Sequence, residues 1–240
     1  MTRPSTRTRV RRLPKRGHYD RATIDAILDE GLVCHVGFVV DGQPFVIPTL
    51  HARDGDRVLI HGSAASRMLG TLDDGVDACL TVTLADQLVI ARSAFHSSMN
   101  YRSVMLLGRA RLIEEPAAKL NALQALVEHL IPGRWNDCRQ PNAKELKATW
   151  ILQMPIDEAS AKIRTGGPID DDEDYVLGFW AGVLPMLKGF GKPVPDPKLR
   201  RGVAAPDYLT RYARPSRAPS ASSKPPRKRS RRSPAPHKPR

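Results

Sequence analysis

Cysteine is scarce in this sequence, and the three that occur, Cys34, Cys79 and Cys138, lie far apart. An odd number of scattered cysteines excludes a disulfide scaffold and the paired spacing of a zinc site, and is typical of reduced thiols in the cytoplasm. No apolar run approaches the roughly 20 residues that span a bilayer, and no signal-type apolar segment follows the N-terminus. We therefore expect a cytoplasmic protein that does not engage a membrane.

Acidic residues are missing from both ends of the chain. Residues 1–17 contain seven Lys and Arg and residues 211–240 contain eleven. Because the two ends contribute +18 to a net charge of +13, residues 18–210 carry a net charge of −5. We expect a basic arm (1–17), one folded domain (18–187) and a disordered Pro/Arg-rich tail (188–240). Such a tail can bind nucleic acid non-specifically, although a solubilising extension is the simpler interpretation.

The familiar catalytic motifs are also missing. The sequence has no G-x-S-x-G, H-E-x-x-H or C-x-x-C motif, no phosphate loop ending in Gly-Lys-Ser/Thr, and no G-x-G-x-x-G after a strand. Three histidines, His35, His51 and His61, fall on neighbouring predicted strands and leave a metal site open as an alternative. They lack the local spacing or adjacent carboxylate that would support it.

Clear turn signals punctuate the rest of the chain. Asp41-Gly42 and Asp54-Gly55 predict hairpin turns in an antiparallel meander. The predicted strands cover residues 32–40, 43–51, 56–60, 76–84, 87–95, 101–113, 151–156 and 158–164, with the fourth and fifth paired around Ala85-Asp86. Helices are predicted at 19–28, from 63 to about 75, at 116–131 and within 134–149. Strands in hairpin order with few helices predict a mainly β fold with flanking helices, a closed or partly closed barrel.

One segment has the pattern of an anion site. Between Val58 and Met68 an apolar strand leads through a Gly/Ser corner into a helix, with Ser63 as the expected cap and Arg67 in the first turn. Backbone N–H groups at a helix N-terminus, two hydroxyls and a guanidinium suit a dianionic phosphate. An ordinary capped helix is the alternative interpretation.

Other polar residues are expected at the same barrel end. They are Thr49 after Pro48, the segment 61–67, and His96 with residues 100–103. Antiparallel strands can bring these segments together despite their separation along the chain. A phosphate near Arg67 would leave the neighbouring strands facing a planar heteroaromatic ring.

Five short segments, in the same order along the chain, resemble those of one known family. They are Cys34-His35-Val36-Gly37-Phe38, Phe45-Val46-Ile47-Pro48-Thr49, His61-Gly62-Ser63-Ala64-Ala65-Ser66-Arg67-Met68, Asn100-Tyr101-Arg102-Ser103-Val104 with Gly108-Arg109-Ala110, and Ala161-Lys162-Ile163-Arg164-Thr165-Gly166. They are similar to the pyridoxamine 5′-phosphate oxidase-like flavoproteins, in particular the flavin-nucleotide-binding branch related to nitroimidazole-resistance proteins. The resemblance implies an FMN-binding split β-barrel and a homodimer with the flavin at the subunit interface.

The resemblance also implies a set of cofactor-binding residues. Ser63, Ser66 and Arg67 would hold the FMN phosphate; Pro48, Thr49, His61 and Gly62 would line the ribityl chain and ring; Tyr101, Arg102 and Ser103 would lie along the ring edge or at the dimer seam. The segment 180–182 would close the site from the partner chain. The Arg-Lys pair of the oxidases is here a single Arg67, and their substrate-phosphate residues have no counterpart. Pyridoxamine phosphate is therefore not the expected substrate.

The resemblance favours an FMN-dependent oxidoreductase that reduces small electron-poor compounds, with a nicotinamide cofactor as a possible electron donor. Arg102 is the candidate for stabilising anionic reduced flavin, and His96 or His61 for relaying a proton. The alternatives are a split barrel that uses deazaflavin or haem, a flavin-binding or sensor protein without turnover, and a nucleic-acid-associated protein.

Overall fold

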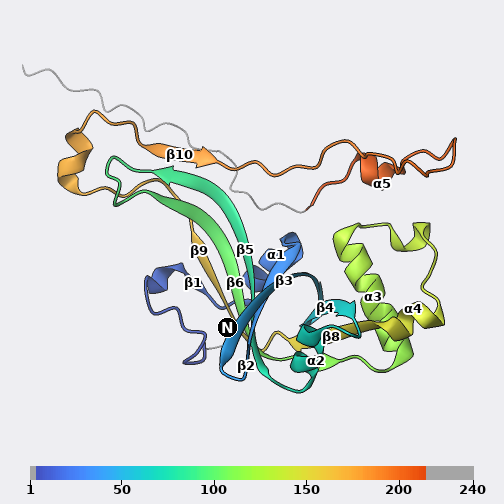
Figure 1. Ribbon diagram of the computed structural model, residues 1–240. Helices are drawn as coiled ribbons and strands as arrows, with labels where there is room; N and C mark the ends of the chain where they lie inside the picture. Colours follow the sequence, from blue (N-terminus) through green and yellow to red (C-terminus); the bar gives the residue numbers. More distant parts are fainter. Residues whose placement is uncertain (1–3, 215–240) are drawn as a thin grey trace, which may run out of the picture.

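The computed structural model describes residues 4–214, and its main feature is one antiparallel sheet of ten strands (Figure 1). The strands follow the order β1-β9-β6-β5-β2-β3-β4-β8-β7, with β10 added to the outer part of β5. Their bounds are β1 Gly17–His18, β2 Val33–Val40, β3 Gln43–Asp54, β4 Arg57–Ser63, β5 Asp77–Ile90, β6 Ser98–Arg109, β7 Arg111–Leu112, β8 Thr149–Pro155, β9 Glu158–Arg164 and β10 Gly182–Pro185. β3 pairs with β2 along residues 43–50 and with β4 along 51–54, so it joins the two halves of a split barrel.

The helices lie around this sheet. Their bounds are α1 Arg21–Glu30, α2 Arg67–Asp73, α3 Pro116–Leu130, α4 Ala143–Ala148 and α5 Asp207–Thr210, with 3₁₀ turns at Pro14–Arg16, Trp135–Asp137 and Asp172–Val176. α1 begins two residues after the predicted start, because the Asp20 carboxylate accepts a hydrogen bond from the Thr23 N–H at 2.9 Å and caps the helix. Among residues 4–214, no helix has both the length and the apolar character that crossing a bilayer requires.

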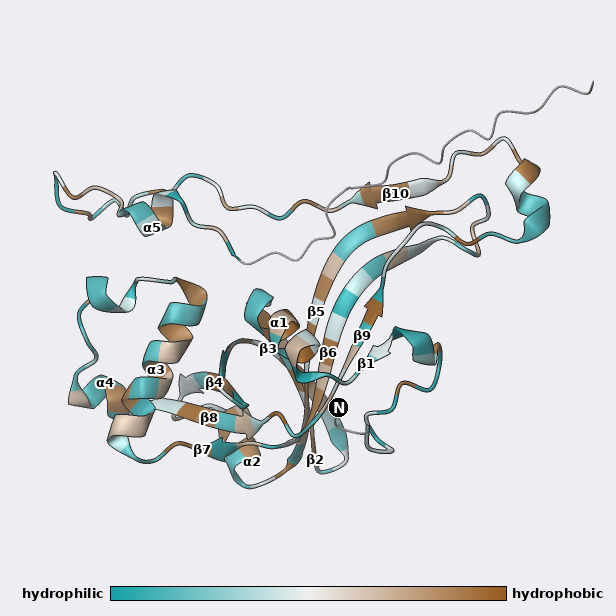
Figure 2. Ribbon diagram, turned by 180° about the vertical axis from the view of Figure 1, so that it is seen from behind, coloured by the Kyte–Doolittle hydropathy of each residue, from teal (hydrophilic) through white to brown (hydrophobic). Residues whose placement is uncertain are grey.

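Two apolar clusters stabilise the fold. The larger lies between α1, α2 and the inner face of the sheet, and includes Leu28, Leu69 and Leu80. The smaller packs α3 through Leu126 against Leu59 of β4. Figure 2 shows hydropathy alternating along β5 and β6, as expected for strands with one buried face. The antiparallel, mainly β prediction is confirmed.

The hairpins agree with the turn signals in one case and differ in another. Asp41 and Gly42 both adopt positive φ, 50° and 78°, which a two-residue hairpin turn requires. The predicted turn at Ala85-Asp86 is wrong. β5 is one continuous strand there, because neither residue adopts positive φ and the chain absorbs the irregularity as a bulge. The reversal comes later, in residues 91–97, so β5 pairs with β6 in one long hairpin.

Both ends of the described chain contact the barrel. Near the N-terminus, Arg7 forms an ion pair with Glu158 of β9, and β1 adds an edge strand beside it. At the other end, residues 186–214 leave β10, extend away and return, where Tyr212 donates a hydrogen bond to the carbonyl oxygen of Leu130 at 2.5 Å. We call residues 186–214 the strap. Residues on both sides of the predicted folded domain, 18–187, thus contact the barrel. The part of the predicted disordered tail from 215 to 240 lies outside the described residues.

Candidate functional site

The segment from β4 to α2 has the expected strand, corner and helix, with a different cap. Helix α2 begins at Arg67 and not at Ser63, and Ser66 is its N-cap, accepting a hydrogen bond from the Leu69 N–H at 3.5 Å. The Ser63 hydroxyl instead accepts the Ala65 N–H at 3.2 Å and shapes the corner. Two serines therefore remain at the corner, one ordering the turn and the other the helix start.

Arg67 is exposed at the start of α2. Its guanidinium lies over the Phe45 ring, 4.9 Å from the centroid, which fixes the direction of the side chain. Within residues 4–214 the structure gives Arg67 no carboxylate partner, so its charge is available to a ligand. The first N–H groups of a helix have no intrahelical acceptor, and the helix dipole adds positive potential there. This corner can hold a phosphate.

Pro48 and Thr49 lie on β3, near the point where it separates from β4. β3 stops pairing with β4 beyond His51 and Ile60, so Pro48-Thr49 and residues 61–63 flank the point where the two strands separate. The Arg67 contact with Phe45 confirms that α2 reaches β3. Pro48 and Thr49 are successive strand residues and point to opposite faces of β3, so they border this separation from different sides.

His61 and Gly62 occupy the end of β4. Burial lowers the pKa of His61 below its ordinary value, and its Nδ1 atom is buried without a hydrogen-bond partner among the described residues. A Cβ on Gly62 would lie 3.1 Å from Leu69 Cδ1, so the absence of a side chain lets α2 pack closely on the strand. Burial thus favours the neutral form of His61 at this corner, and Gly62 contributes through packing.

The structure separates Arg102 from Tyr101 and Ser103. Successive strand residues point to opposite faces, and in β6 Arg102 is buried on the α1 side while its two neighbours are half-buried on the other face. Ser103 lines a hollow of about 240 Å³ beneath the arginine-rich N-terminal arm. The three residues therefore cannot line one ring edge together within a single chain.

Arg102 is the centre of a buried ion cluster. Its guanidinium donates to both oxygens of Glu30, at 2.5 and 2.8 Å, and to both oxygens of Asp86, at 3.0 and 2.8 Å. Hydrogen bonds to Asp86 and Glu30 raise the pKa of Arg102 above its ordinary value. With two carboxylates around one guanidinium, the cluster has a formal charge of −1 and cannot supply the positive charge expected near a flavin.

His96 lies at the far tip of the β5–β6 hairpin. Figure 1 places that tip and α2 at opposite ends of the molecule, so one chain does not bring His96 to the phosphate corner. Its Nε2 atom is 3.2 Å from Asp171 Oδ2, and Asp174 is close enough for the three side chains to form a candidate cation cluster. Nearby, Asp170 accepts hydrogen bonds from the Arg92 and Ser93 N–H groups. These bonds hold the tip of the β5–β6 hairpin against residues 166–176.

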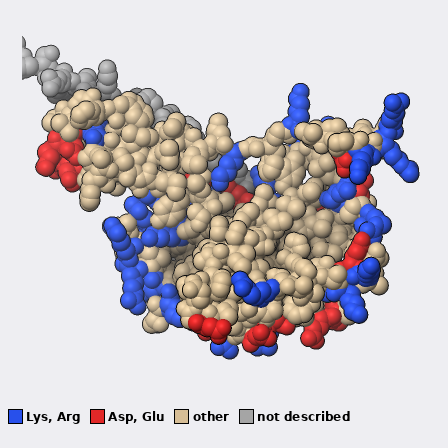
Figure 3. Space-filling model, in the orientation of Figure 1, with Lys and Arg blue, Asp and Glu red and all other residues tan. Residues whose placement is uncertain are grey.

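A cavity of about 700 Å³ lies between the barrel and the strap, and we call it the strap cavity. Figure 3 shows the surface hollowed beneath this part of the chain. The barrel side is formed by residues 30–33, 83–87 and Arg102, and the opposite side by Pro185 of β10 and by strap residues 186–190 and 212–214. Sequence reasoning missed this cavity, because nothing in the local pattern shows that residues far apart in the chain meet around it.

Arg214 anchors the returning end of the strap. Its guanidinium donates to the carbonyl oxygens of Asp29 at 2.5 Å and Glu30 at 3.2 Å, and also to that of His129. These carbonyls belong to the last turns of α1 and α3, where the helix dipoles favour a cation. Phe190 packs edge-on against Tyr212, with ring centroids 4.4 Å apart, and joins the two ends of the strap beside the cavity.

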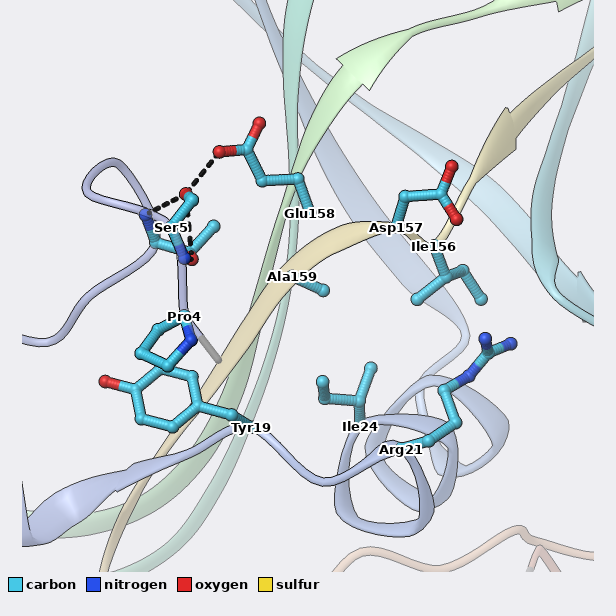
Figure 4. Close-up of a pocket in the computed structure, with 10 residues that line it drawn as sticks. Pro4, Ser5, Tyr19, Arg21, Ile24, Ile156, Asp157, Glu158 and Ala159 are labelled. Atoms are coloured by element: carbon cyan, nitrogen blue, oxygen red, sulfur yellow. Dashed lines mark hydrogen bonds between the residues drawn. The ribbon is translucent and has the colours of Figure 1, made fainter. Parts of the chain in front are cut away.

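A smaller hollow lies under the N-terminal arm (Figure 4). It measures about 90 Å³ and is bordered by Tyr19, Ile24 and Ala159, while Ser5 donates a hydrogen bond to Glu158 across it. It is well below the roughly 300–1,000 Å³ of ligand cavities. Of the hollows described, the strap cavity alone has the volume of a cofactor site.

Comparison with known proteins gives a consistent result. A family model described as pyridoxamine 5′-phosphate oxidase matches residues 20–163. The flavocytochrome Anf3 from Azotobacter vinelandii is 48% identical over 86% of this chain and 96% of its own, with a TM-score of 0.82. An FAD- and haem-binding protein from Mycobacterium smegmatis is 38% identical over 81% of this chain and 97% of its own, with a TM-score of 0.78.

One further solved structure shares the fold at lower sequence identity. A protein assigned to 5-nitroimidazole antibiotic resistance from Bacteroides thetaiotaomicron is 22% identical over 61% of this chain and 86% of its own. Its TM-score of 0.52 shows a shared fold. A search of curated proteins finds no match.

Proposed function

Because the chain belongs to the pyridoxamine 5′-phosphate oxidase family of split barrels, we propose that it is a flavin-binding redox protein. The family and fold expected from the sequence are confirmed. The observation that carries the functional proposal is similarity along nearly the whole length of two proteins, one named as a flavocytochrome and the other as binding FAD and haem. Both names point to flavin chemistry, and neither names a substrate.

The phosphate corner has the donor set that a flavin requires. The exposed Arg67 guanidinium, the Ser63 and Ser66 hydroxyls and the start of α2 would hold the phosphate next to the ribityl chain. That phosphate is common to FMN and FAD, so the same residues serve either cofactor. The family resemblance favours FMN and the name of the relative from Mycobacterium smegmatis favours FAD; we retain FMN as the expectation.

A bound flavin would supply the two-electron and one-electron chemistry that amino-acid side chains cannot. The chain's own residues bind and orient it. Arg67 binds the phosphate, Pro48 and Thr49 border the space beyond it, and burial lowers the pKa of the half-buried His61, which favours its neutral form. We propose a small electron-poor molecule as the substrate and a nicotinamide cofactor as the electron donor.

Exposed apolar side chains support a homodimer. On the outward face of β2 and β3, Val33, Val39 and Val46 are 45%, 50% and 67% exposed, and Trp180 beside β10 is 68% exposed. A second copy that covered this face would also cover Pro48, which points the same way. We therefore propose a flavin held between two protomers. Sedimentation of the flavin-loaded chain should give a dimer, and a flavin-loaded monomer would refute this part.

The two relatives also favour haem as a second cofactor, since haem or cytochrome occurs in both of their names. The strap cavity has the volume for such a group, and its walls combine apolar side chains with the Arg102 ion cluster. Haem was one of the alternatives left open by the sequence. It now stands beside the flavin in the proposal and does not replace it.

The visible spectrum of the freshly purified full chain tests the proposal. We expect flavin absorbance, with the released flavin identified as FMN or FAD by chromatography. Arg67→Met should weaken flavin binding by at least about tenfold, since a hydrogen bond to a charged group contributes roughly 1.5–3 kcal/mol. Arg111→Met, which removes an exposed arginine on β7, is the matched control and should bind normally. A folded but colourless protein that takes up neither FMN nor FAD would end the proposal.

A further inference from the structure

The larger of the two hollows under the N-terminal arm is lined by basic side chains, and we call it the basic hollow. It measures about 240 Å³, and five of its ten lining residues are Arg or Lys while none is Asp or Glu. The five are Arg7, Arg9, Arg11, Arg12 and Lys162. Figure 3 shows Lys and Arg side chains gathered over this part of the chain, at the left of the view. The potential inside the hollow therefore attracts anions.

Most of these cations have no acidic partner. Arg7 forms an ion pair with Glu158, but within residues 4–214 no carboxylate pairs with the other four. Residues 1–3 and 215–240 contain no Asp or Glu that could supply one. Because like charges repel, a bound anion would relieve the repulsion among these four side chains.

The arm that carries the arginines is held in place on both sides of Arg9. Ser5 and Arg7 donate hydrogen bonds to the Glu158 carboxylate, and the Val10 N–H donates to the Tyr19 hydroxyl at 2.9 Å. The guanidinium groups thus extend from an ordered backbone. Less conformational entropy is lost when such a preorganised segment binds a ligand.

The floor of the hollow contains a buried hydroxyl without a partner. Ser160 of β9 is 5% exposed, and its hydroxyl forms no hydrogen bond with any residue in the described part of the chain. Ser160 pairs in register with Met105, and Lys162 pairs with Ser103, so these side chains share one face of the sheet. Buried hydroxyls are nearly always hydrogen-bonded, so Ser160 beside the Lys162 ammonium favours a ligand rich in oxygen.

The buried Arg164 extends the positive charge along β9. It lies two residues beyond Lys162 on the same face, is 6% exposed, and donates to the amide oxygen of Asn100, a neutral group. Burial, followed by repulsion from Arg16, lowers the pKa of Arg164 below its ordinary value. Buried charges are usually paired, so this arginine is a second sign that an anion binds nearby.

The basic hollow and the proposed flavin site lie on one face of the sheet. A row of cross-strand partners joins them: Pro48 pairs with His35, His35 with Thr81, Thr81 with Met105, and Met105 with Ser160. Four strand spacings separate the two ends of this row, roughly 19 Å. The phosphate corner lies one strand further away, at the end of β4. A long ligand held in the hollow could therefore extend toward a flavin beside Pro48 without using the phosphate corner.

We propose that the basic hollow binds a diphosphate ester, the group that the proposed nicotinamide electron donor carries. The identity of the donor rests on the proposed function. Two adjacent phosphates bring more negative charge than the roughly −1.5 to −2 of a phosphate monoester, which suits four unpaired cations. The hollow is smaller than the roughly 300–1,000 Å³ of whole-ligand cavities, so only the phosphates enter it and the remaining molecule lies along the outward face.

The first test titrates sodium pyrophosphate into the flavin-loaded full-length chain by calorimetry at constant ionic strength, so that flavin occupies the phosphate corner. Arg9→Gln combined with Arg12→Gln should bind pyrophosphate at least about tenfold more weakly and keep its flavin, since hydrogen bonds to charged groups are lost. The matched control combines Arg200→Gln with Arg201→Gln, two exposed positions on the strap. It removes the same charge and should bind as the wild type does. Any binding by the basic tail is common to all these proteins.

A substitution in the floor separates a defined site from general attraction to the arm. Ser160→Ala leaves the net charge unchanged and should weaken pyrophosphate binding about tenfold. Ser98→Ala, at the exposed start of β6, should leave it unchanged. Wild-type binding by the Arg9/Arg12 variant and by Ser160→Ala would overturn the site, and so would equal weakening by the two arginine pairs. Loss of flavin from the Arg9/Arg12 variant would show that the hollow holds the flavin itself, and would overturn a separate site.

Competition and kinetics identify the diphosphate. ADP and NADPH should displace pyrophosphate, and AMP should do so less well; equal displacement by AMP would overturn the assignment to a diphosphate. In flavin reduction by NADPH, the Arg9/Arg12 variant should raise KM at least about tenfold with kcat nearly unchanged, because the hollow holds a part of the donor remote from the reaction. An unchanged KM would overturn the nicotinamide donor as the ligand. A colourless chain would refute the proposed function, whereas the pyrophosphate titrations would still decide the hollow.

Discussion

Replacing Arg102 by methionine should strongly destabilise the protein. The side chains of Arg102, Glu30 and Asp86 are only 10%, 16% and 9% exposed, so methionine would leave two buried carboxylates facing each other without a cation. Breaking a buried ion pair by removing one partner typically costs about 3–5 kcal/mol. At about 2–4 °C per kcal/mol for a chain of this size, the melting temperature should fall by roughly 6–20 °C.

The assays are thermal unfolding, for the melting temperature, and urea unfolding, for the free energy, both followed by tryptophan fluorescence at equal protein concentration and equal cofactor content. The matched control is Arg109→Met on the same strand, because Arg109 pairs with Asp77 at the surface, where both side chains are more than 60% exposed. Exposed pairs are screened by water, so this variant should unfold close to the wild-type midpoint.

A combined variant isolates the cause. Replacing Arg102 by methionine together with Glu30→Gln and Asp86→Asn removes the unpaired charges as well as the guanidinium. It should therefore recover a large part of the stability that Arg102→Met loses. The reasoning is refuted if Arg102→Met costs less than about 1 kcal/mol, the net value of an ordinary hydrogen bond. It is equally refuted if the triple variant is no more stable than the single one.

Two further predictions concern the packing around α1. Burial, followed by repulsion from His129, lowers the pKa of His51 from 6.5 to about 4, so the unfolded chain takes up this proton before the folded one. The contribution of His51 to the free energy of unfolding should be fully present above about pH 6.5 and should be lost, by roughly 3 kcal/mol, as the pH drops to about 4. In His51→Asn the urea midpoint should depend less steeply on pH. A Cβ at Gly31 would lie 2.4 Å from Val82 Cγ1, so Gly31→Ala should cost about 1–3 kcal/mol in thermal unfolding. Gly70→Ala in α2 meets open space and should not destabilise; equal effects of the two would contradict the packing argument.

Local sequence signals predicted most of the barrel. The hairpin at Asp41-Gly42 was predictable because a two-residue turn needs positive φ at both positions, and Asp and Gly adopt such values readily. The corner between β4 and α2 also follows from local residues, although its cap is Ser66, three residues later than the predicted Ser63. From the sequence alone, the serines at 63 and 66 are nearly equivalent as capping residues. In the structure Ser63 pairs with Thr149 of β8 and is the last residue of β4, so the helix begins after Ser66.

The features that sequence reasoning missed depend on long-range contacts. Arg102 contacts Glu30, 72 positions earlier in the chain, and that contact reverses its expected role beside a flavin. The strap returns to α3 through Tyr212, in a segment whose composition alone predicted disorder. Ala85-Asp86 resembled a turn, but Asp86 instead serves the ion cluster, and β5 continues past it. Each case joins residues that only the folded chain brings together.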